Sequence, residues 1–216
     1  MNDLKGKLLI NTTKLEGIYE LAEITSNLAL AQNSAIKNCV NSGDSSCITN
    51  IRNDLVLKLW RRPTSLLQND VNDLISFENS LDNNSSKLKF LIFSLILSDR
   101  FLYRSEIGTL TDDNIAVLNN YEIINLLSYS IWDSAPDATL FQLATKSGAI
   151  TTSEMLTQIN RMVTSDKTNT TIVKLVKDYL KLDKVLSIEK NSSLGFSDDI
   201  RKNLLTSVEM SIKDNI

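Results

Sequence analysis

Apolar residues recur at intervals of three and four positions through most of this chain, which is the spacing that gathers them on one side of an α-helix. Stretches of this kind start near Thr12, Ile48, Ser65, Lys87, Tyr121, Asp137, Thr151, Ile172 and Ser197. The 216 residues include only six Gly and two Pro, so a sandwich or barrel would lack its usual turn residues. The sequence therefore predicts an all-α fold, an irregular multi-helix bundle of about nine helices.

Local signals set the ends of the helices that we expect in the first part of the chain. The spacing predicts an amphipathic helix over 12–32, and a second helix that stops before Pro63, whose ring cannot continue a helix. Ser65 and Gln68 have the spacing of a capping box at the start of a third helix. Residues 87–104 are apolar on most faces at first and charged near the end, which predicts a central helix in the core.

Further along the chain, turn-forming and helix-capping residues punctuate the pattern. Turn formers fill 108–120, where only the IAVL string at 115–118 is typical of an extended segment, so we expect a long loop. Thr151 and Glu154 form another capping-box pair. Ser197 is placed to cap the last helix.

Several chemistries and partners are disfavoured by composition. The chain contains no histidine, so it cannot form a Ser-His-Asp triad, a Cys-His pair or a CxxCH haem site, and we expect no cofactor and no metal. The net charge of −3, with both signs interspersed, makes nucleic acid a poor partner. The longest apolar run, 89–98, is far shorter than the about 20 residues of a membrane-spanning helix, so no span is predicted. No signal peptide is visible in the chain as given.

The only two cysteines, Cys39 and Cys47, lie in the string NCVNSGDSSC. We expect this string to be a loop that is flexible enough to bring them together. A disulfide is therefore feasible, and it would matter only in an oxidising compartment. The alternative is two unlinked thiols in a reduced cytoplasm.

Several strings, taken together, resemble one protein family. CITNIRNDLVLKLWRRPTS looks like the helix that ends at an Arg-Arg-Pro motif in the large secreted proteins of planctomycetes, myxobacteria and related bacteria called planctomycete cytochrome c-like proteins. The strings that follow, in the order and spacing of the next module of those proteins, are SDRFLYRSEIG, LNNYEIINLLSYSIWDSAPDATLFQLA, RMVTSD and DYLKL. On this resemblance, 10–85 form an N-terminal helical module whose second helix ends at Arg-Arg-Pro, 86–216 form a C-terminal helical module, and the two pack as one unit.

The resemblance implies an extracytoplasmic protein, periplasmic, cell-surface or secreted, whose activity is unknown. Longer relatives can carry a haem-binding cytochrome domain at one end. Catalytic residues are not implied and stay unknown. We expect this chain to be a fragment or a short member of the longer architecture, with another protein or the missing domains as its partner. An oxidising compartment also favours the Cys39–Cys47 bridge.

Arg100 and Arg104 lie one helical turn apart. Two guanidinium groups on one side of a helix could clamp a carboxylate or a phosphate. More often such arginines pair with acids of a neighbouring helix, here with Glu122 or Asp133 as candidates. The structural interpretation is favoured, and both arginines are kept as candidate contacts for an anion or a partner.

Arg61 and Arg62 directly precede Pro63 and invite the same two interpretations. A helix C-terminus is where cationic side chains offset the helix dipole and bind free carbonyls, so capping alone would explain them. They are likewise kept as candidate anion or partner contacts. We expect Trp60 and Trp132 to be packing residues rather than stacking platforms.

A basic stripe runs opposite an apolar one on the helix that starts near Ile172. The basic residues are Lys174, Lys177, Lys181 and Lys184, and the apolar ones are Ile172, Val176 and Tyr179 with Leu175 beside them. The lysines form either a docking face for an acidic partner or a solvated face. The solvated face is favoured because Asp178 and Asp183 interrupt the stripe.

Two pairs of adjacent acids, 112–113 and 198–199, are the candidate carboxyl groups for a glycosidase-type site. Such a site needs two carboxyl groups that face each other across a cleft, which adjacency does not provide. Asp198 and Asp199 suit a helix start, where negative charge meets the positive end of the dipole. Asp112 and Asp113 suit a turn.

The sequence thus favours a non-catalytic helical interaction or scaffold module of an extracytoplasmic protein, accessory to a cytochrome c-type electron-transfer or polymer-degrading system. The alternative is a fragment of a carboxylate-based hydrolase that acts on an extracellular polymer. Oligomeric state is left open.

Overall fold

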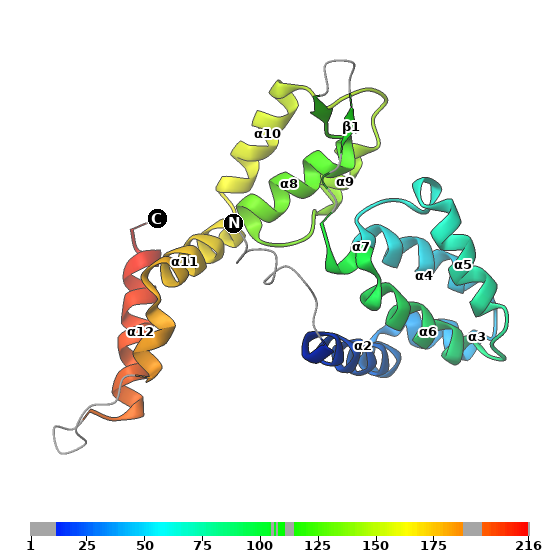
Figure 1. The fold of residues 1–216 in the computed structure, drawn as a ribbon, viewed down its shortest axis with the longest axis horizontal. Helices are drawn as coiled ribbons and strands as arrows, with labels where there is room; N and C mark the ends of the chain where they lie inside the picture. The colour runs from blue at the N-terminus through cyan, green and yellow to red at the C-terminus, as the bar shows by residue number, and fades with distance from the viewer. Residues whose placement is uncertain (1–11, 105, 107, 111–114, 188–195, 216) are drawn as a thin grey trace. The chain divides into compact units, whose positions relative to one another are not determined.

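The computed structural model describes residues 12–104, 106, 108–110, 115–187 and 196–215 (Figure 1). The described residues are overwhelmingly helical, and ten of their α-helices have seven or more residues, so the predicted all-α class is confirmed. Two compact units divide the chain between Glu122 and Ile123. The expected break at 82–86 falls inside the first unit, at the turn between two helices that pack together, and the division into modules at 85/86 stays a prediction.

The described residues of the first unit form six complete α-helices and the first turn of α8. Its helices are α2 (Thr12–Gln32), α3 (Ser34–Ser42), α4 (Ser46–Leu55), the π-helical turn η1 (Val56–Trp60), the 3-10 turn η2 (Thr64–Leu66), α5 (Gln68–Glu78), α6 (Asn84–Leu97) and α7 (Asp99–Leu102), and α8 (Asn120–Trp132) begins at its end. Two short strands, β1 (Thr109–Leu110) and β2 (Ala116–Val117), pair antiparallel.

The central helix of this unit is α6, as the sequence predicted for the start of 87–104. It ends at Leu97, however, and Asp99–Leu102 form the separate short helix α7. The α6 helix contacts α2, α3, α4, α5 and η1, and Leu88, Leu91 and Leu95 on it are fully buried. Trp60 is also buried, as expected for a packing residue, and its indole Nε1 donates to the Leu95 carbonyl at 3.2 Å. Because the last carbonyls of a helix have no partner within it, this bond fixes η1 against the end of α6.

The cysteine string is mostly helical, so the expected loop is wrong. Asn33 separates α2 from α3 and is the N-cap of α3, since its side-chain oxygen accepts from the Ile36 N–H at 3.1 Å. Gly43 ends α3 with a φ of 65°, a conformation that costs glycine little. Cys39 therefore lies on α3 and Cys47 on α4, with only a tight turn between them.

Two other predicted boundaries also need correction. The N-cap of α5 is Leu67, not Ser65, because 64–66 form the 3-10 turn η2 instead of the first turn of the helix. The expected loop 108–120 contains the β1–β2 pair, of which only the second strand was anticipated. Gly108 precedes β1 with a φ of +66°, and a Cβ there would lie 2.8 Å from the Val117 carbonyl oxygen, so the turn needs glycine.

The second unit consists of the rest of α8 and four further α-helices. These are α9 (Ala138–Ala144), α10 (Thr152–Val163), α11 (Asp166–Leu180) and α12 (Asp198–Lys213), with a 3-10 turn η3 (Leu182–Ser187) after α11. The capping box of Thr151 and Glu154 is confirmed. Ser197 caps α12 as predicted, and Asp198 and Asp199 occupy its first turn.

Candidate functional site

The predicted anion contacts Arg61 and Arg62 lie at the end of η1, on the interior side of the first unit. Arg61 is buried with a φ of 59° and ends the π-helical turn. Its guanidinium donates to the carbonyl oxygens of Arg100 and, at 3.0 Å, of Tyr103, which lie in and after α7. The sequence anticipated that such an arginine binds free carbonyls, but these carbonyls belong to a different helix.

Arg62 forms an ion pair with Glu122, whose side chain is only 3% exposed. The Arg62 Nη2 atom donates to Glu122 Oε1 at 2.8 Å. Glu122 also accepts from the backbone N–H of Asn119 at 2.9 Å, while Asn119 Oδ1 accepts from the Glu122 N–H at 3.1 Å. This reciprocal pair is a capping box at the start of α8, so one carboxylate serves both the ion pair and the helix end.

The strings that carry the family resemblance therefore meet in the folded chain. Arg61 and Arg62 come from Arg-Arg-Pro, the carbonyl acceptors from RFLYR, and Glu122 from LNNYE. Gly108 donates its N–H to the same Glu122 carboxylate at 3.4 Å. We name Arg61, Arg62, Glu122 and the carbonyl groups that accept from Arg61 the arginine cluster. Its bonds connect η1 to α7 and to the first turn of α8.

The other two candidate arginines are also engaged by acids, although not by the acids that we expected. Arg100 donates to Asp70 Oδ2 at 2.8 Å, and Arg104 lies 2.5 Å from Glu106. The candidate partner Glu122 is taken by Arg62, and Asp133 by Lys174. Arg100 and Arg104 do not form a joint clamp in α7, since that helix ends at Leu102.

A second buried ion pair, between Arg52 and Glu78, was not anticipated. Arg52 on α4 donates from both Nε and Nη2 to the Glu78 carboxylate at the end of α5, with 3.1 Å for the Nε bond. Both side chains are buried. The helical spacing placed Arg52 near the apolar stripe of its helix, but nothing local indicated which acid would meet it.

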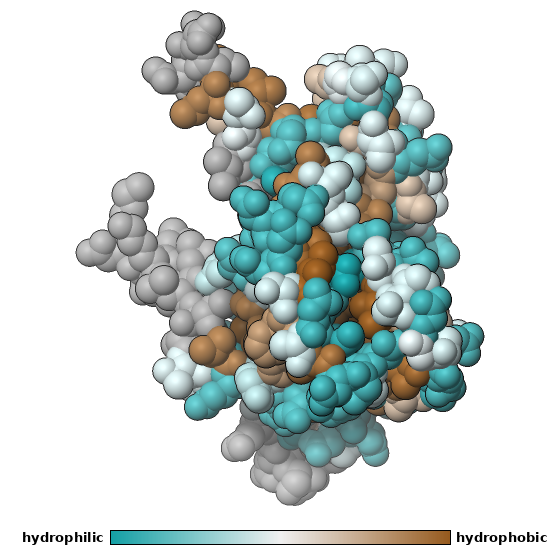
Figure 2. Space-filling model, turned by 90° about the vertical axis from the view of Figure 1, so that its right-hand side faces the viewer, coloured by the Kyte–Doolittle hydropathy of each residue, from teal (hydrophilic) through white to brown (hydrophobic). Residues whose placement is uncertain are grey.

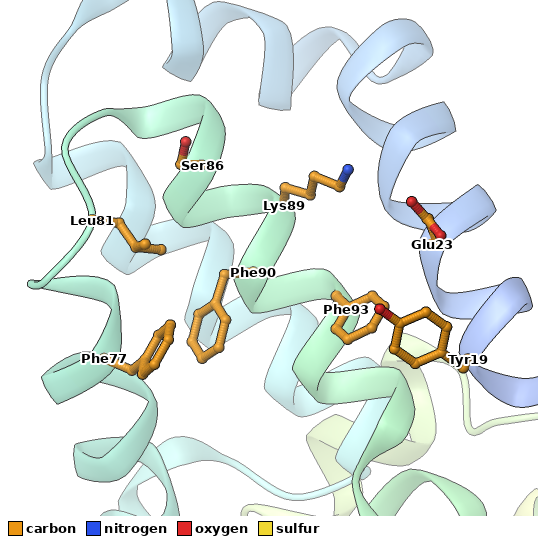
Figure 3. A pocket seen from close by; sticks show the side chains of 8 residues that line it. All are labelled: Tyr19, Glu23, Phe77, Leu81, Ser86, Lys89, Phe90 and Phe93. Atoms are coloured by element: carbon orange, nitrogen blue, oxygen red, sulfur yellow. The ribbon is translucent and has the colours of Figure 1, made fainter. Parts of the chain in front are cut away.

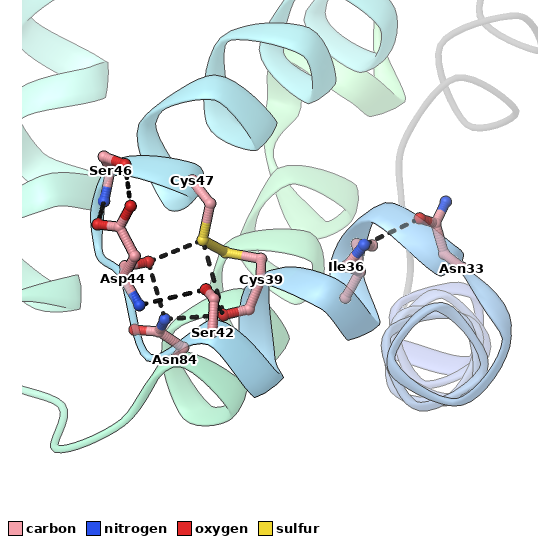
Figure 4. The surroundings of a disulfide bond; sticks show 8 residues. All are labelled: Asn33, Ile36, Cys39, Ser42, Asp44, Ser46, Cys47 and Asn84. Atoms are coloured by element: carbon pink, nitrogen blue, oxygen red, sulfur yellow. Dashed lines mark hydrogen bonds between the residues drawn. A yellow bond between two sulfur atoms is a disulfide. The ribbon is translucent and has the colours of Figure 1, made fainter.

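The disulfide joins Cys39 and Cys47, with their Cα atoms 5.6 Å apart (Figure 4). The buried side chain of Asn84 donates to the carbonyl oxygens of Cys39, at 3.0 Å, and Asp44, at 3.1 Å. The bridge and Asn84 thus fasten the α3–α4 turn to the first turn of α6. Hydrogen bonds from the Ser46 hydroxyl and the Ser46 N–H lower the pKa of Asp44 in that turn.

The double variant Cys39→Ser/Cys47→Ser, which lacks the disulfide, is expected to have a free energy of unfolding of the first unit lower by about 2–3 kcal/mol. The reason is that the unfolded chain gains conformational entropy when the cross-link is absent. Urea unfolding followed by Trp60 fluorescence in a Trp132→Phe background measures the change. Ser42→Ala, in the same turn, is the control and should shift the midpoint much less. Equal stability of the bridged and unbridged chains would contradict the expectation.

In the second unit, Trp132 is buried and surrounded by hydrogen-bonded and cationic groups. Its Nε1 atom donates to the Met162 carbonyl at 3.1 Å, and the Lys167 ammonium lies 4.7 Å from its ring. Arg161 lies 5.3 Å from the same ring and forms an ion pair with Asp137 at 2.7 Å. Burial raises the pKa of Asp137, but hydrogen bonds from Arg161 and the Leu140 N–H outweigh it and lower the pKa overall. Trp132 is a packing residue, as predicted.

Acidification is expected to weaken the second unit through Glu154. Hydrogen bonds from Lys146 and from the N–H and hydroxyl of Thr151 lower its pKa from 4.5 to about 2. Because the folded-state pKa lies below the unfolded value, the stabilisation is complete above pH 4.5 and is lost as the pH falls through about 2. Glu154→Gln should therefore destabilise the unit at neutral pH and make little difference near pH 2.

Urea unfolding followed by Trp132 fluorescence, in a Trp60→Phe background, measures that difference across the pH range. Glu20→Gln, on the exposed side of α2, is the control and should leave the Trp132 transition unchanged at every pH. A constant difference between Glu154→Gln and the parent chain down to pH 2 would contradict the expectation.

The basic stripe of α11 is partly used inside the second unit. Lys174 pairs with Asp133, and hydrogen bonding to that acid raises the pKa of the lysine. Lys177 pairs with Glu209 on α12. Lys181 ends α11 with a φ of 52°, and Lys184 lies in η3. The pair Asp112 and Asp113 lies outside the described residues.

A groove in the first unit is a site that sequence reasoning missed. It has a volume of about 330 Å³ and is open to solvent between α2 and α5, with α6 as its floor (Figure 3). Its lining comprises Tyr19, Glu23, Phe77, Leu81, Ser86, Lys89, Phe90 and Phe93. We call it the aromatic groove.

Four aromatic rings form the walls and floor of this groove. Phe77 and Phe90 stack with ring centroids 4.3 Å apart, and Tyr19 meets Phe93 edge to face at 5.0 Å. Phe77 and Tyr19 remain 52% and 54% exposed. The sequence did not indicate this place for Tyr19, because spacing alone cannot separate a buried ring from one at the edge of a groove.

Two charged side chains, Glu23 and Lys89, lie beside the rings (Figure 3). Neither takes part in a salt bridge among the described residues. By contrast, Arg62, Arg100 and Arg104 pair with acids, and Arg61 donates to backbone carbonyls. The groove therefore combines apolar surface with one carboxylate and one ammonium group that are available to a ligand.

The fold and these sites define a disulfide-bonded, all-α protein whose motif residues are engaged internally. Residues 118–216 match the model of the PSD4 family, described as a protein of unknown function (DUF1592). That match covers slightly less than half of the chain and includes the whole of the second unit. No curated protein and no solved structure matches the chain.

None of the helices in the described part of the chain combines the length and apolar character of a bilayer-crossing segment. Within the same residues, no group of three or more His, Cys, Asp or Glu side chains is arranged to hold a metal ion.

Proposed function

We propose that this chain is a non-catalytic helical interaction module, and that the aromatic groove is where it binds its partner. The observation that carries the proposal is the contrast between the two kinds of site. Arg61 and Arg62, which were kept as candidate anion contacts, are occupied by internal acceptors. The aromatic groove exposes large rings and unpaired charges, which is typical of a surface that binds another molecule.

The occupant that best fits the groove is an amphipathic helix of a partner protein. The floor residues Ser86, Lys89 and Phe93 repeat at helical spacing along α6, and α2 and α5 lie on either side of it, so the groove resembles the slot left by an absent helix. Apolar side chains of the partner would contact the four rings. An acid and a base flanking its apolar stripe would meet Lys89 and Glu23.

Export to an extracytoplasmic compartment is part of the proposal. It is supported by the Cys39–Cys47 bridge, because disulfides persist in oxidising compartments and are rare in reducing ones. The resemblance to planctomycete cytochrome c-like proteins supports the same location and suggests a cytochrome c-type or polymer-degrading system as the setting. No contact among the described residues favours the hydrolase alternative. Of the two acid pairs considered for it, Asp198 and Asp199 lie in the first turn of α12.

Site-specific photo-crosslinking in the native cell envelope tests the groove. A benzoylphenylalanine at position 77 is expected to crosslink to a helical segment of one partner, and Lys89→Glu should abolish that product. Reversing the matching acid in the partner should restore it. The same label at Leu28, which is exposed on α2 outside the groove, is the matched control.

Two results would overturn the proposal. One is equal crosslinking from positions 28 and 77, or crosslinking to a polysaccharide instead of a protein. The other is turnover of a polysaccharide by the purified chain alone, which would show that the module is catalytic.

A further inference from the structure

Part of the apolar stripe of α11 is exposed to solvent. Leu175 and Tyr179, one turn apart, are 66% and 83% exposed. The side of α11 that meets α12 instead carries the buried Val173 and Lys177, whose ammonium group pairs with Glu209. α11 and α12 lie side by side as a hairpin (Figure 1). They are joined through a partly polar seam, and within the described part of the chain the most apolar side of the hairpin is exposed.

The second helix of this hairpin continues the same apolar surface. Ile200 and Leu204 are exposed on α12, and no residue of α12 is buried. At about 100° of rotation per residue, the half-buried Ile172 and Val176 lie between the exposed residues of α11 and those of α12 in an antiparallel pair. We name Ile172, Leu175, Val176, Tyr179, Ile200 and Leu204 the hairpin stripe.

We propose that the hairpin stripe is a homodimer interface, at which two copies of the chain pair their hairpins into a four-helix bundle. A hairpin with one apolar side is half of such a bundle, and a two-fold axis lets the same surface serve both copies. The exposed part of the stripe amounts to on the order of 500 Å² per copy and roughly 1,000 Å² for two, the lower limit of a specific interface. The seam residues Lys177 and Glu209 already satisfy each other, so dimerisation does not require breaking their ion pair.

This interface is independent of the aromatic groove, which lies in the other unit. A dimer would present two aromatic grooves, one per copy, to a partner. Bivalent display raises the apparent affinity without any new contact, when the partner carries two matching helices.

Sedimentation velocity of the whole chain, over a wide range of concentration, tests the proposal. The chain is expected to sediment with twice its monomer mass, and the variant Leu175→Glu/Tyr179→Glu with the monomer mass. Leu156→Glu, which changes an equally apolar exposed residue of α10, is the matched control and should stay dimeric. A monomer at all concentrations in the unmodified chain would overturn the proposal.

A second measurement separates loss of the interface from loss of folding. Benzoylphenylalanine at position 179 should yield a covalent dimer on illumination, and the same label at position 156 should not. Circular dichroism of Leu175→Glu/Tyr179→Glu should show unchanged helix content. Crosslinks from position 179 only into the same chain, or binding of the chain to phosphatidylcholine vesicles that Tyr179→Glu abolishes while the chain stays monomeric, would count against a dimer.

Discussion

Replacing Arg62 by methionine is expected to lower the free energy of unfolding of the first unit by about 3–5 kcal/mol. The methionine keeps much of the apolar stem of the arginine but leaves the Glu122 carboxylate, 3% exposed, without its cationic partner. Glu122 also caps α8 and binds the Gly108 N–H, so it cannot turn towards solvent without losing those bonds. Urea unfolding read from Trp60 in a Trp132→Phe background measures the first unit alone.

The matched control for this experiment is Lys58→Met, close by on η1. Lys58 pairs with Asp54 at 2.8 Å, but both side chains are more than half exposed, so the loss should stay below about 1 kcal/mol. Similar losses for the two variants would show that Arg62 is a surface contact. The double variant Arg62→Met/Glu122→Gln should recover part of the loss, because the amide keeps an oxygen for the Asn119 N–H and removes the buried charge.

Replacing Arg52 by methionine is expected to have a comparable effect, about 3–5 kcal/mol, through a different pair of helices. Arg52 is the only cation paired with Glu78 among the described residues, and the glutamate side chain is 3% exposed between α4 and α5. Because both partners are buried, replacing both by methionine should cost much less than the single change, and can even stabilise the unit. A four-variant cycle with Glu78→Met, measured by urea unfolding, gives the coupling free energy.

A coupling close to zero in that cycle would contradict the structure at this site. It would indicate that Glu78 finds water or another partner when Arg52 is absent. The change in the free energy of unfolding of the Arg52→Met/Glu78→Met double variant is informative in its own right. A large loss of stability there would show that the ion pair determines how α4 and α5 pack, and does more than fill the space between them.

Sequence periodicity and capping signals anticipated much of the fold. The helix over 12–32, the capping box of Thr151 and Glu154 and the cap at Ser197 all occur as predicted. These features are local, because a helix needs only its own spacing and the hydrogen-bonding groups within one turn of its end. Where a competing local structure was available, as with the 3-10 turn at 64–66, the capping signal misled.

What the sequence could not supply were contacts between residues that lie far apart in the chain. Arg61 and Arg62 were singled out, yet their acceptors follow 39 or more positions later. The exposure of the hairpin stripe could not be predicted, since an exposed apolar stripe and a buried one have the same spacing. The aromatic groove was missed because it depends on how α2 and α5 are placed on either side of α6, which is a contact between distant parts of the sequence.

The central claim is that the arginines of the Arg-Arg-Pro motif hold the first unit together instead of capturing an external anion. Side-chain NMR of arginine-labelled protein during titration with inorganic phosphate tests it most directly. The Nε–H signals of Arg61 and Arg62 are predicted to exchange slowly with water and to keep their positions as phosphate is added. Saturable shifts of both signals would contradict the claim, since they would show that an external anion reaches the guanidinium groups.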